Sequence, residues 1–166
     1  MIDVNATSDG DVVENVGLGA QIKGRVSVAH DALDQLLSPE FQRLGLTPGE
    51  ADVLTVLLIA EDHTLAPTDL ADWLGLTTAG LTARLNALEE RSLIERRLHP
   101  TDGRRRTVHF TPEGLDRAET VMRLKDDVVA EHVVTTLGDE DAARLVGLLD
   151  TVISAATAAT IRRPRL

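Results

Sequence analysis

The sequence predicts a mainly α-helical protein that carries one small β-hairpin. Apolar residues recur at helical spacing over most of the chain. Aromatic residues make up only 2% of it, so the core must be built from Leu, Val, Ile and Ala, which suits packed helices better than a sheet sandwich. The exception is a Pro-Thr-Asp-Gly turn at 100–103, which lies between two alternating runs and indicates a hairpin.

A long amphipathic helix is expected to begin at Leu18. Its apolar stripe is spaced by four, three, four and four residues, and consists of Ile22, Val26, Ala29, Leu33 and Leu37. We expect this helix to end near Leu37 or Ser38. Residues 1–15 are acidic and show no periodicity, and we interpret them as a mobile acidic leader.

A second helix is predicted from a capping box. Thr47 is an N-cap residue, Pro48 stands at the first helical position, and Glu50 lies three residues after the cap. The body, Ala51 to Ala60, is apolar almost all the way round. A helix of that kind is buried on most sides, so we expect it at the centre of the domain.

Two shorter helices follow and predict a helix-turn-helix. The third helix, Thr68 to Leu74, is preceded by a short stretch ending at Leu65 and ends at Gly75. The fourth begins at Thr77, with its leucines on one face and small or polar residues on the other. Short helices joined across Leu74-Gly75-Leu76 are typical of that motif.

The hairpin strands are expected at 93–97 and 106–110. Thr111-Pro112-Glu113 then caps another long helix, and a last helix begins near Gly138, with acidic residues in its positive first turn. The apolar stripe of the last helix consists of Leu145, Leu148, Leu149, Val152, Ile153 and Ala156. Residues 162–166 form a basic tail.

The charge of the chain is unevenly distributed. A formal net charge of -10 argues at first against a nucleic-acid partner, because duplex DNA repels an acidic surface. Over residues 84–106, however, seven arginines face four acids, a local excess of +3. The acidity therefore lies elsewhere, as suits a protein of which one face meets phosphate.

Five stretches resemble the MarR family of bacterial regulators: 70–76, 81–89, 93–97, Asp102-Gly103-Arg104, and 108–111 with Gly114. The resemblance covers about residues 18–160, and the spacing within the hairpin is its most specific part. It implies a winged helix-turn-helix over 47–111, with N- and C-terminal dimerisation helices over 16–46 and 112–161. We therefore expect one domain, 16–161, that works as a homodimer on double-stranded DNA at a pseudo-palindromic operator.

The fourth helix, near residues 77–91, has the composition of a recognition helix. Its outward face must be slim and polar for the backbone to enter a major groove about 12 Å wide. The candidate contacts are Thr77, Thr78, Gly80, Thr82, Arg84 and Asn86. Threonine can bond base edges or touch a thymine methyl, and Arg or Asn can reach a base or a phosphate. The alternative is that these are ordinary solvated helix residues.

The hairpin is the candidate wing, and its tip carries cations. A narrow minor groove concentrates negative potential and attracts arginines, which predicts contacts from Arg104, Arg105 and Arg106. The family's Asp-x-Arg pattern implies that Asp102 holds the guanidinium of Arg104 in a fixed direction. The alternative is a solvated turn that aids solubility.

The resemblance also implies regulation by a small aromatic or anionic effector, held between the dimerisation helices and the winged helix, and it favours a repressor. This chain resembles the urate-responding subgroup at Asp52 and Arg97. It differs from that subgroup in having His109 where an arginine is expected, and in having no tryptophan in the first helix. These differences argue against urate and leave an anionic ligand held by Arg96 or Arg97 as a hypothesis. The alternative is that Asp52 pairs locally and the arginines brace the wing.

Other classes of function have weaker support. The chain has no cysteine, its histidines are scattered, and it shows no nucleophile–base pair or phosphate-binding glycine loop, so we expect no metal, no cofactor and no enzymatic activity. The longest apolar stretch, 53–60, is too short to span a bilayer, which favours a cytoplasmic protein. The remaining alternative is a winged-helix interaction or dimerisation module without DNA binding.

Overall fold

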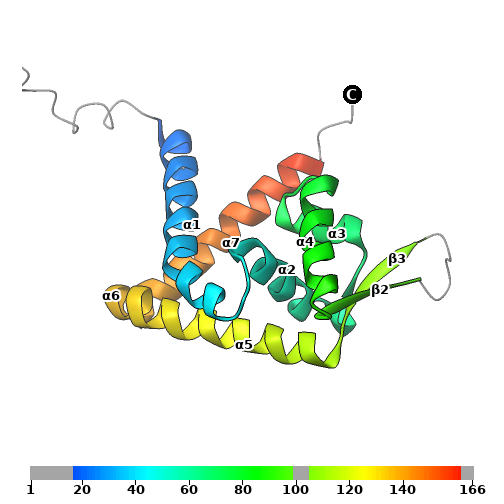
Figure 1. Cartoon of the computed structure of the whole chain (residues 1–166). Helices are drawn as coiled ribbons and strands as arrows, with labels where there is room; N and C mark the ends of the chain where they lie inside the picture. The colour runs from blue at the N-terminus through cyan, green and yellow to red at the C-terminus, as the bar shows by residue number, and fades with distance from the viewer. Residues whose placement is uncertain (1–16, 99–104, 162–166) are drawn as a thin grey trace, which may run out of the picture.

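The structure is a computed structural model that describes residues 17–98 and 105–161, with side chains described to residue 158. The elements are α1 (Leu18–Arg43), α2 (Pro48–Ile59), η1 (Glu61–His63), β1 (Thr64–Leu65), α3 (Pro67–Leu74), α4 (Thr78–Glu90), β2 (Ile94–Leu98), β3 (Arg106–Phe110), α5 (Pro112–Val129), η2 (Ala130–Val134), α6 (Thr135–Leu137) and α7 (Asp139–Ile161). The predicted class, mainly α with a small hairpin, is confirmed (Figure 1). The expected leader, the turn at 100–103 and the basic tail lie outside the described residues.

The second helix is the centre of the domain, as its composition predicts. Its capping box is complete: the Thr47 hydroxyl accepts the Glu50 backbone N–H at 3.3 Å, and the Glu50 carboxylate accepts that of Thr47 at 2.8 Å. Val53, Leu54 and Leu57 of α2 are fully buried. The core around them is contributed by α1, α3, α4, α5 and the sheet, so α2 locates these four helices.

The first helix runs further than the sequence predicted. Instead of ending near Leu37 or Ser38, α1 continues through Pro39 to Arg43. Proline lacks the N–H of a normal helical turn, but Leu37 and Phe41 on either side are 6% and 1% exposed, and their burial outweighs the missing bond. The helix ends where Gly45 adopts a φ of +70° and Leu46 N–H donates to the Phe41 carbonyl at 2.8 Å.

The sheet has the order β1-β3-β2, and both pairings are antiparallel. The register of the hairpin pairs Ile94 with Phe110 and Leu98 with Arg106, which confirms the predicted strands to within a residue. The first strand was not predicted. It has only two residues, Thr64–Leu65, too few to show a period, and exists because β3 offers a free edge.

The C-terminal helices extend away from the core. Figure 1 shows α5 beneath the other helices and α7 returning behind them after α6. The turn into α7 lies at Gly138, with a φ of +79°, where the sequence placed it. The π-helical η2 was not predicted. Residues 143–158 of α7 are exposed throughout, so the described part of the chain leaves most of this helix uncovered. Among the described helices, none is long and apolar enough to cross a membrane.

Candidate nucleic-acid interface

The helix-turn-helix is formed by short-range bonds. Gly75 ends α3 with a φ of +62°, and Leu76 N–H donates to the Ala71 carbonyl at 2.9 Å. Thr77 then caps α4, its hydroxyl accepting the Gly80 N–H at 3.2 Å. The leucines of α4 that enter the core are Leu81, Leu85 and Leu88. Because their burial fixes the rotation of α4, its opposite face is turned outward.

That outward face is lined by small and polar side chains. The exposed residues include Thr77, Thr78, Ala79, Thr82, Ala83 and Asn86, while Gly80 is half-buried. The Thr82 hydroxyl donates to the Thr78 carbonyl at 2.7 Å, which leaves its oxygen free to accept. Four of the six predicted contacts on this helix are therefore exposed, Gly80 and Arg84 are half-buried, and their contacts with DNA stay a prediction.

Arg84 is placed differently from the sequence-based expectation. Its side chain is half-buried, and Nη1 donates to the Gly49 carbonyl of α2 at 3.2 Å. The approach is so close that a Cβ on Gly49 would lie 2.4 Å from Arg84 Cζ. Helical position alone does not reveal this direction, because a long flexible side chain can bend to either side of the helix.

A second arginine holds the end of α4. Arg91 pairs with Glu50 and also donates to the Gly45 carbonyl. Burial raises the pKa of Glu50, but hydrogen bonds from Arg91 and Thr47 outweigh it, so the net pKa lies below its usual value. Arg84 and Arg91 thus hold the recognition helix against the start of α2, and a DNA contact from Arg84 stays a prediction.

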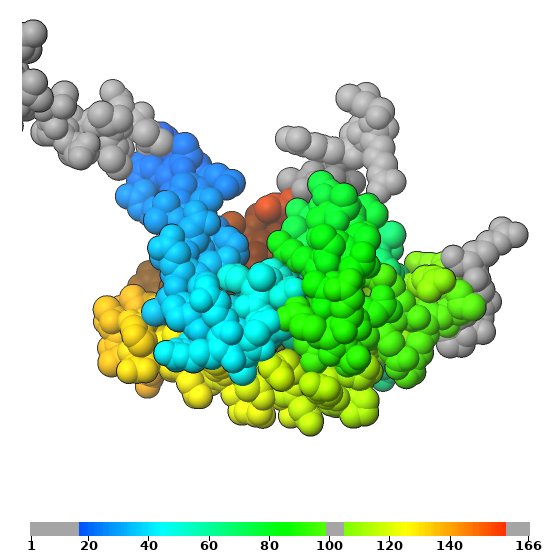
Figure 2. Space-filling view, viewed as in Figure 1, coloured from blue at the N-terminus to red at the C-terminus, as the bar shows by residue number. Residues whose placement is uncertain are grey.

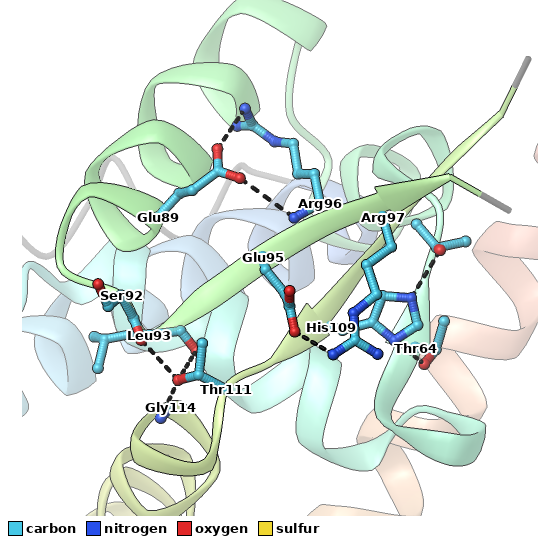
Figure 3. A network of polar contacts seen from close by, with 11 residues as sticks. Thr64, Glu89, Ser92, Leu93, Glu95, Arg96, Arg97, His109, Thr111 and Gly114 are labelled. Carbon is cyan, nitrogen blue, oxygen red and sulfur yellow. Dashed lines mark hydrogen bonds and ion pairs between the residues drawn. The ribbon is translucent and has the colours of Figure 1, made fainter.

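The hairpin is tied to α4 through Arg96 (Figure 3). Its Nη1 lies 3.0 Å from Glu89 Oε2, and its backbone N–H donates to Glu89 Oε1 at 3.3 Å. Nη2 also donates to Asn86 Oδ1 at 2.8 Å. The predicted bracing role of Arg96 therefore has a geometric basis, and Asn86 keeps its amide N–H groups for other partners.

The junction between α4 and α5 is also shown in Figure 3. Ser92 has a φ of +57° after the last turn of α4. The Thr111 hydroxyl donates to the Ser92 carbonyl at 2.6 Å and accepts the Gly114 N–H at 3.0 Å. Gly114 packs directly on the backbone of Leu93, where a side chain would not fit.

The other two hairpin residues proposed for an effector lie together on the opposite side of the sheet. Arg97 pairs with Glu95, and His109 lies between two hydroxyls, with Nδ1 3.1 Å from Thr64 Oγ1 and Nε2 2.8 Å from Thr107 Oγ1. Burial lowers the pKa of His109, and the Arg97 guanidinium lowers it further, against an opposing effect of Glu95. Each group thus already has a partner.

The wing is described only in part. Arg105 and Arg106 are exposed, and among the described residues neither forms an ion pair. They are the cations nearest the hairpin tip that the structure places. Asp102 and Arg104 lie outside the described residues, so the implied pairing between them stays a prediction.

A cleft of about 430 Å³ lies beside the recognition helix. Its lining comes from α1, α2, α3, α4 and the turn before α4, and consists of His30, Asp34, Gly49, Asp52, Thr55, Val56, Trp73, Leu74, Leu76 and Arg84. Figure 2 shows the surface receding between α1 and α4. Of the four predicted effector residues, only Asp52 lines the cleft, and Lys125 Nζ lies 2.9 Å from its Oδ1.

Sequence reasoning missed the aromatic wall of this cleft. Trp73 is 63% exposed on α3, although it is the only tryptophan of the chain. An exposed indole in a chain with so few rings is a usable signal for a binding surface. Over the described ranges, no group of three or more His, Asp or Glu could hold a metal ion.

Comparison with known sequences gives a consistent picture. The model of the MarR family matches residues 44–105. The HTH-type transcriptional repressor YetL of Bacillus subtilis is 33% identical over 118 residues, which cover 64% of this chain and 71% of the relative. A regulatory protein of Thauera aromatica is 35% identical, and a second regulator of Bacillus subtilis is 26% identical. The chain covers 61% and 57% of the lengths of these two relatives, which is less than two thirds of each.

Solved structures share the fold. AbsC, a MarR family transcriptional regulator from Streptomyces coelicolor, has a TM-score of 0.71 at 22% identity, with 86% of this chain and 97% of AbsC covered. A mutant of MarR from E. coli complexed with operator DNA has a TM-score of 0.67 at 26% identity, with 82% of this chain and 99% of that mutant covered. The helical order and the small sheet described above are thus those of these regulators.

Proposed function

This chain belongs to the MarR family of winged-helix transcriptional regulators, and from that premise we propose that it represses transcription as a homodimer that binds a pseudo-palindromic operator and leaves it when a small effector binds. The chain is a DNA-binding regulator and, like the relatives it matches, not an enzyme. Repression is proposed because the relative YetL is a repressor.

The observation that carries DNA binding is the outward face of α4. Thr78, Thr82 and Asn86 follow one another at intervals of four residues and are all exposed, and the small residues Ala79 and Ala83 lie beside them. Such a face allows the backbone to approach base edges, while Arg105 and Arg106 stand on the adjoining hairpin. We propose that the helix reads the major groove and the hairpin contacts the minor groove.

The homodimer is supported by apolar surface that the described residues leave uncovered. Leu149 of α7 is 38% exposed and Ile153 is 62% exposed, and Leu145, Leu148 and Val152 lie between these values. Ile22 and Val26 of α1 are 49% and 40% exposed. Rows of exposed apolar side chains of this kind are typical of an interface. A dimer is also what presents two recognition helices to successive half-sites.

The effector is proposed to bind in the cleft between α1, α2, α3 and α4. Its volume of about 430 Å³ lies within the range of small-molecule sites. The cleft adjoins both a helix of the proposed interface and the recognition helix, so a ligand there can change their relative position. Asp52 is the predicted effector residue retained in this proposal, since Arg96 is paired with α4 and since Arg97 and His109 have partners on the sheet.

DNA binding is tested by fluorescence anisotropy on DNA from upstream of the chain's own gene, with a scrambled duplex as the control. A dimer that neutralises about ten phosphates should show a log–log salt slope of about -9. A slope near zero, or equal affinity for the scrambled duplex, would contradict operator recognition and favour the interaction module instead.

The dimer is tested by light scattering coupled to gel filtration. The wild type should have twice the chain mass of 17.9 kDa. Leu149→Glu introduces a charge into the apolar stripe and should give a monomer that binds the operator at least about tenfold more weakly. Ser154→Glu, on the opposite face of α7, is the matched control and should stay dimeric. A monomeric wild type at micromolar concentration would refute the dimer.

A further inference from the structure

The outward face of the recognition helix carries an asparagine that the hairpin holds by its oxygen. Asn86 is exposed and lies one turn after Thr82 on the face proposed to meet base edges. Arg96 Nη2 donates to the amide oxygen of Asn86, Oδ1, at 2.8 Å. A guanidinium has N–H donors and no acceptor, so the atom of Asn86 that it contacts must be the oxygen. The direction of the amide is therefore fixed, and its two N–H donors are the part left for DNA.

Arg96 is itself held in place by Glu89. Its Nη1 lies 3.0 Å from Glu89 Oε2, and its backbone N–H donates to Glu89 Oε1 at 3.3 Å, so one carboxylate binds both ends of the residue (Figure 3). The Arg96 side chain is only 20% exposed, and bonds shielded from water in this way are stronger. Glu89 and Asn86 lie three residues apart on one side of α4, so a single guanidinium reaches both. Arg96 thus keeps the amide of Asn86 in one orientation.

A fixed amide changes which base an asparagine can bind. An asparagine that is free to turn commonly binds adenine, donating to N7 and accepting from the N6 amino group. In this chain the oxygen already accepts a charge-assisted bond, so an adenine amino group would approach it beside a second donor that is positively charged. Guanine presents two acceptors, N7 and O6, at its major-groove edge. The observed orientation of Asn86 therefore matches guanine and not adenine.

We infer that Asn86 selects guanine at one position of each half-site, and that Arg96 is the positioning residue that sets this preference. The inference rests on the proposed operator recognition and adds the base that one side chain selects. In this arrangement the hairpin contributes to reading the major groove without entering it, because one of its residues orients a side chain of α4.

The test is selection of duplexes from a randomised library by the full-length protein, followed by anisotropy titrations on the selected operator. Comparison of the wild type with Asn86→Ala identifies the position that Asn86 reads, because truncation should remove the base preference there and leave the other positions unchanged. In the wild type that base should be guanine, favoured over adenine by about fivefold or more. Because Asn86 is exposed, Asn86→Ala should fold like the wild type.

A second variant frees the amide without changing Asn86. Arg96→Met keeps a long side chain but has no N–H donor, so the Asn86 oxygen can accept from adenine. The preference at the same position should shift from guanine towards adenine by about fivefold or more. Arg97→Met is the matched control, because Arg97 pairs with Glu95 on the opposite side of the sheet, and it should leave the preference unchanged. A purely structural role of Arg96 would instead lower the affinity for every duplex to the same extent.

A third variant tests the direction of the hydrogen bonds even if Arg96→Met does not fold. Asn86→Asp keeps the shape of the side chain at an exposed position and replaces its donors with an acceptor. The preferred base should change from guanine to cytosine, whose N4 amino group donates in the major groove.

The inference is overturned by an adenine preference of the wild type at that position, or by a guanine preference that persists in folded Arg96→Met or in Asn86→Asp. Failure of the proposed function looks different. If no sequence is enriched from the library, operator recognition falls and the inference falls with it. If an operator is enriched but no position depends on Asn86, operator recognition stands and only the inference falls.

Discussion

Replacing Gly114 with alanine should destabilise the protein through one backbone contact. Gly114 lies in the first turn of α5, and a Cβ built on it would be 1.6 Å from the Leu93 carbonyl oxygen and 2.6 Å from its carbon. Both atoms belong to the backbone and cannot rotate away. To bring 1.6 Å to the 3.0 Å floor of real Cβ contacts, α5 and the start of the hairpin must separate by about 1.4 Å.

That separation breaks the bonds that cross the junction described above. Thr111 N–H donates to the Leu93 carbonyl at 3.2 Å, and the Thr111 hydroxyl donates to the Ser92 carbonyl at 2.6 Å. Each bond contributes about 1 kcal/mol, and alanine returns about 1 kcal/mol of helix propensity. The free energy of unfolding should therefore fall by about 1 kcal/mol, and Tm by roughly 2–4 °C.

The assay is urea denaturation followed by circular dichroism at one fixed protein concentration. Gly24→Ala in α1 is the matched control, because nothing lies within 4 Å of its Cβ and it faces away from Ile22 and Val26. It should raise the free energy of unfolding by up to about 1 kcal/mol. Equal stability of Gly114→Ala and wild type would refute the close approach of α5 to Leu93.

Three further predictions concern charge. Arg91→Gln leaves the buried Glu50 without its partner and should lower the free energy of unfolding by about 2 kcal/mol. In the wild type, the stability that this pair contributes is present above pH 4.5 and is lost as the pH falls through the lowered pKa of Glu50. Urea denaturation at a series of pH values should therefore show a smaller acid-dependent loss of stability in the variant. Because the pKa of His109 is lowered in the folded protein, the unfolded chain binds its proton at a higher pH, and the free energy of unfolding should fall as the pH drops below 6.5. His109→Gln should reduce this dependence of stability on pH. An unchanged dependence would show that His109 is not its source. In anisotropy titrations, Arg106→Gln should reduce the log–log salt slope of operator binding by about two per dimer, as expected for a phosphate contact. Thr78→Ala should weaken operator binding about tenfold at an unchanged salt slope, as expected for a base contact. The reverse pattern would assign the phosphate contact to Thr78 and the base contact to Arg106.

Much of the helix-turn-helix could be predicted from residues that are close in sequence. The capping box of Thr47 and Glu50, the left-handed Gly75 and the Thr77 cap each depend on contacts within four or five residues. The leucines of α4 are spaced to meet one side of the helix, so its outward face followed as well. The one local rule that failed was the expected stop before Pro39, because core packing of Phe41 outweighed it.

The candidate site was predicted less completely, because partners decide where a charged side chain lies. The position of Arg84 on the fourth helix placed it with the DNA contacts, and the family resemblance placed Arg96 and Arg97 with an effector. In the fold, Arg84 turns to Gly49, while the other two pair with Glu89 and Glu95. Three of the seven arginines counted from the sequence are thus paired with glutamates, and Arg105 and Arg106 are left as described cations of the wing.

The sequence by itself determined the order of helices, their caps and the hairpin, since periodicity, capping and turn chemistry act between near neighbours. Only the tertiary structure decided the cleft, the first strand and the direction of Arg84. The bonds responsible join residues 35, 45 and 73 positions apart, from Arg84 to Gly49, from Thr64 to His109 and from Lys125 to Asp52. No local window contains both partners of such a bond, and burial of the core brings them together.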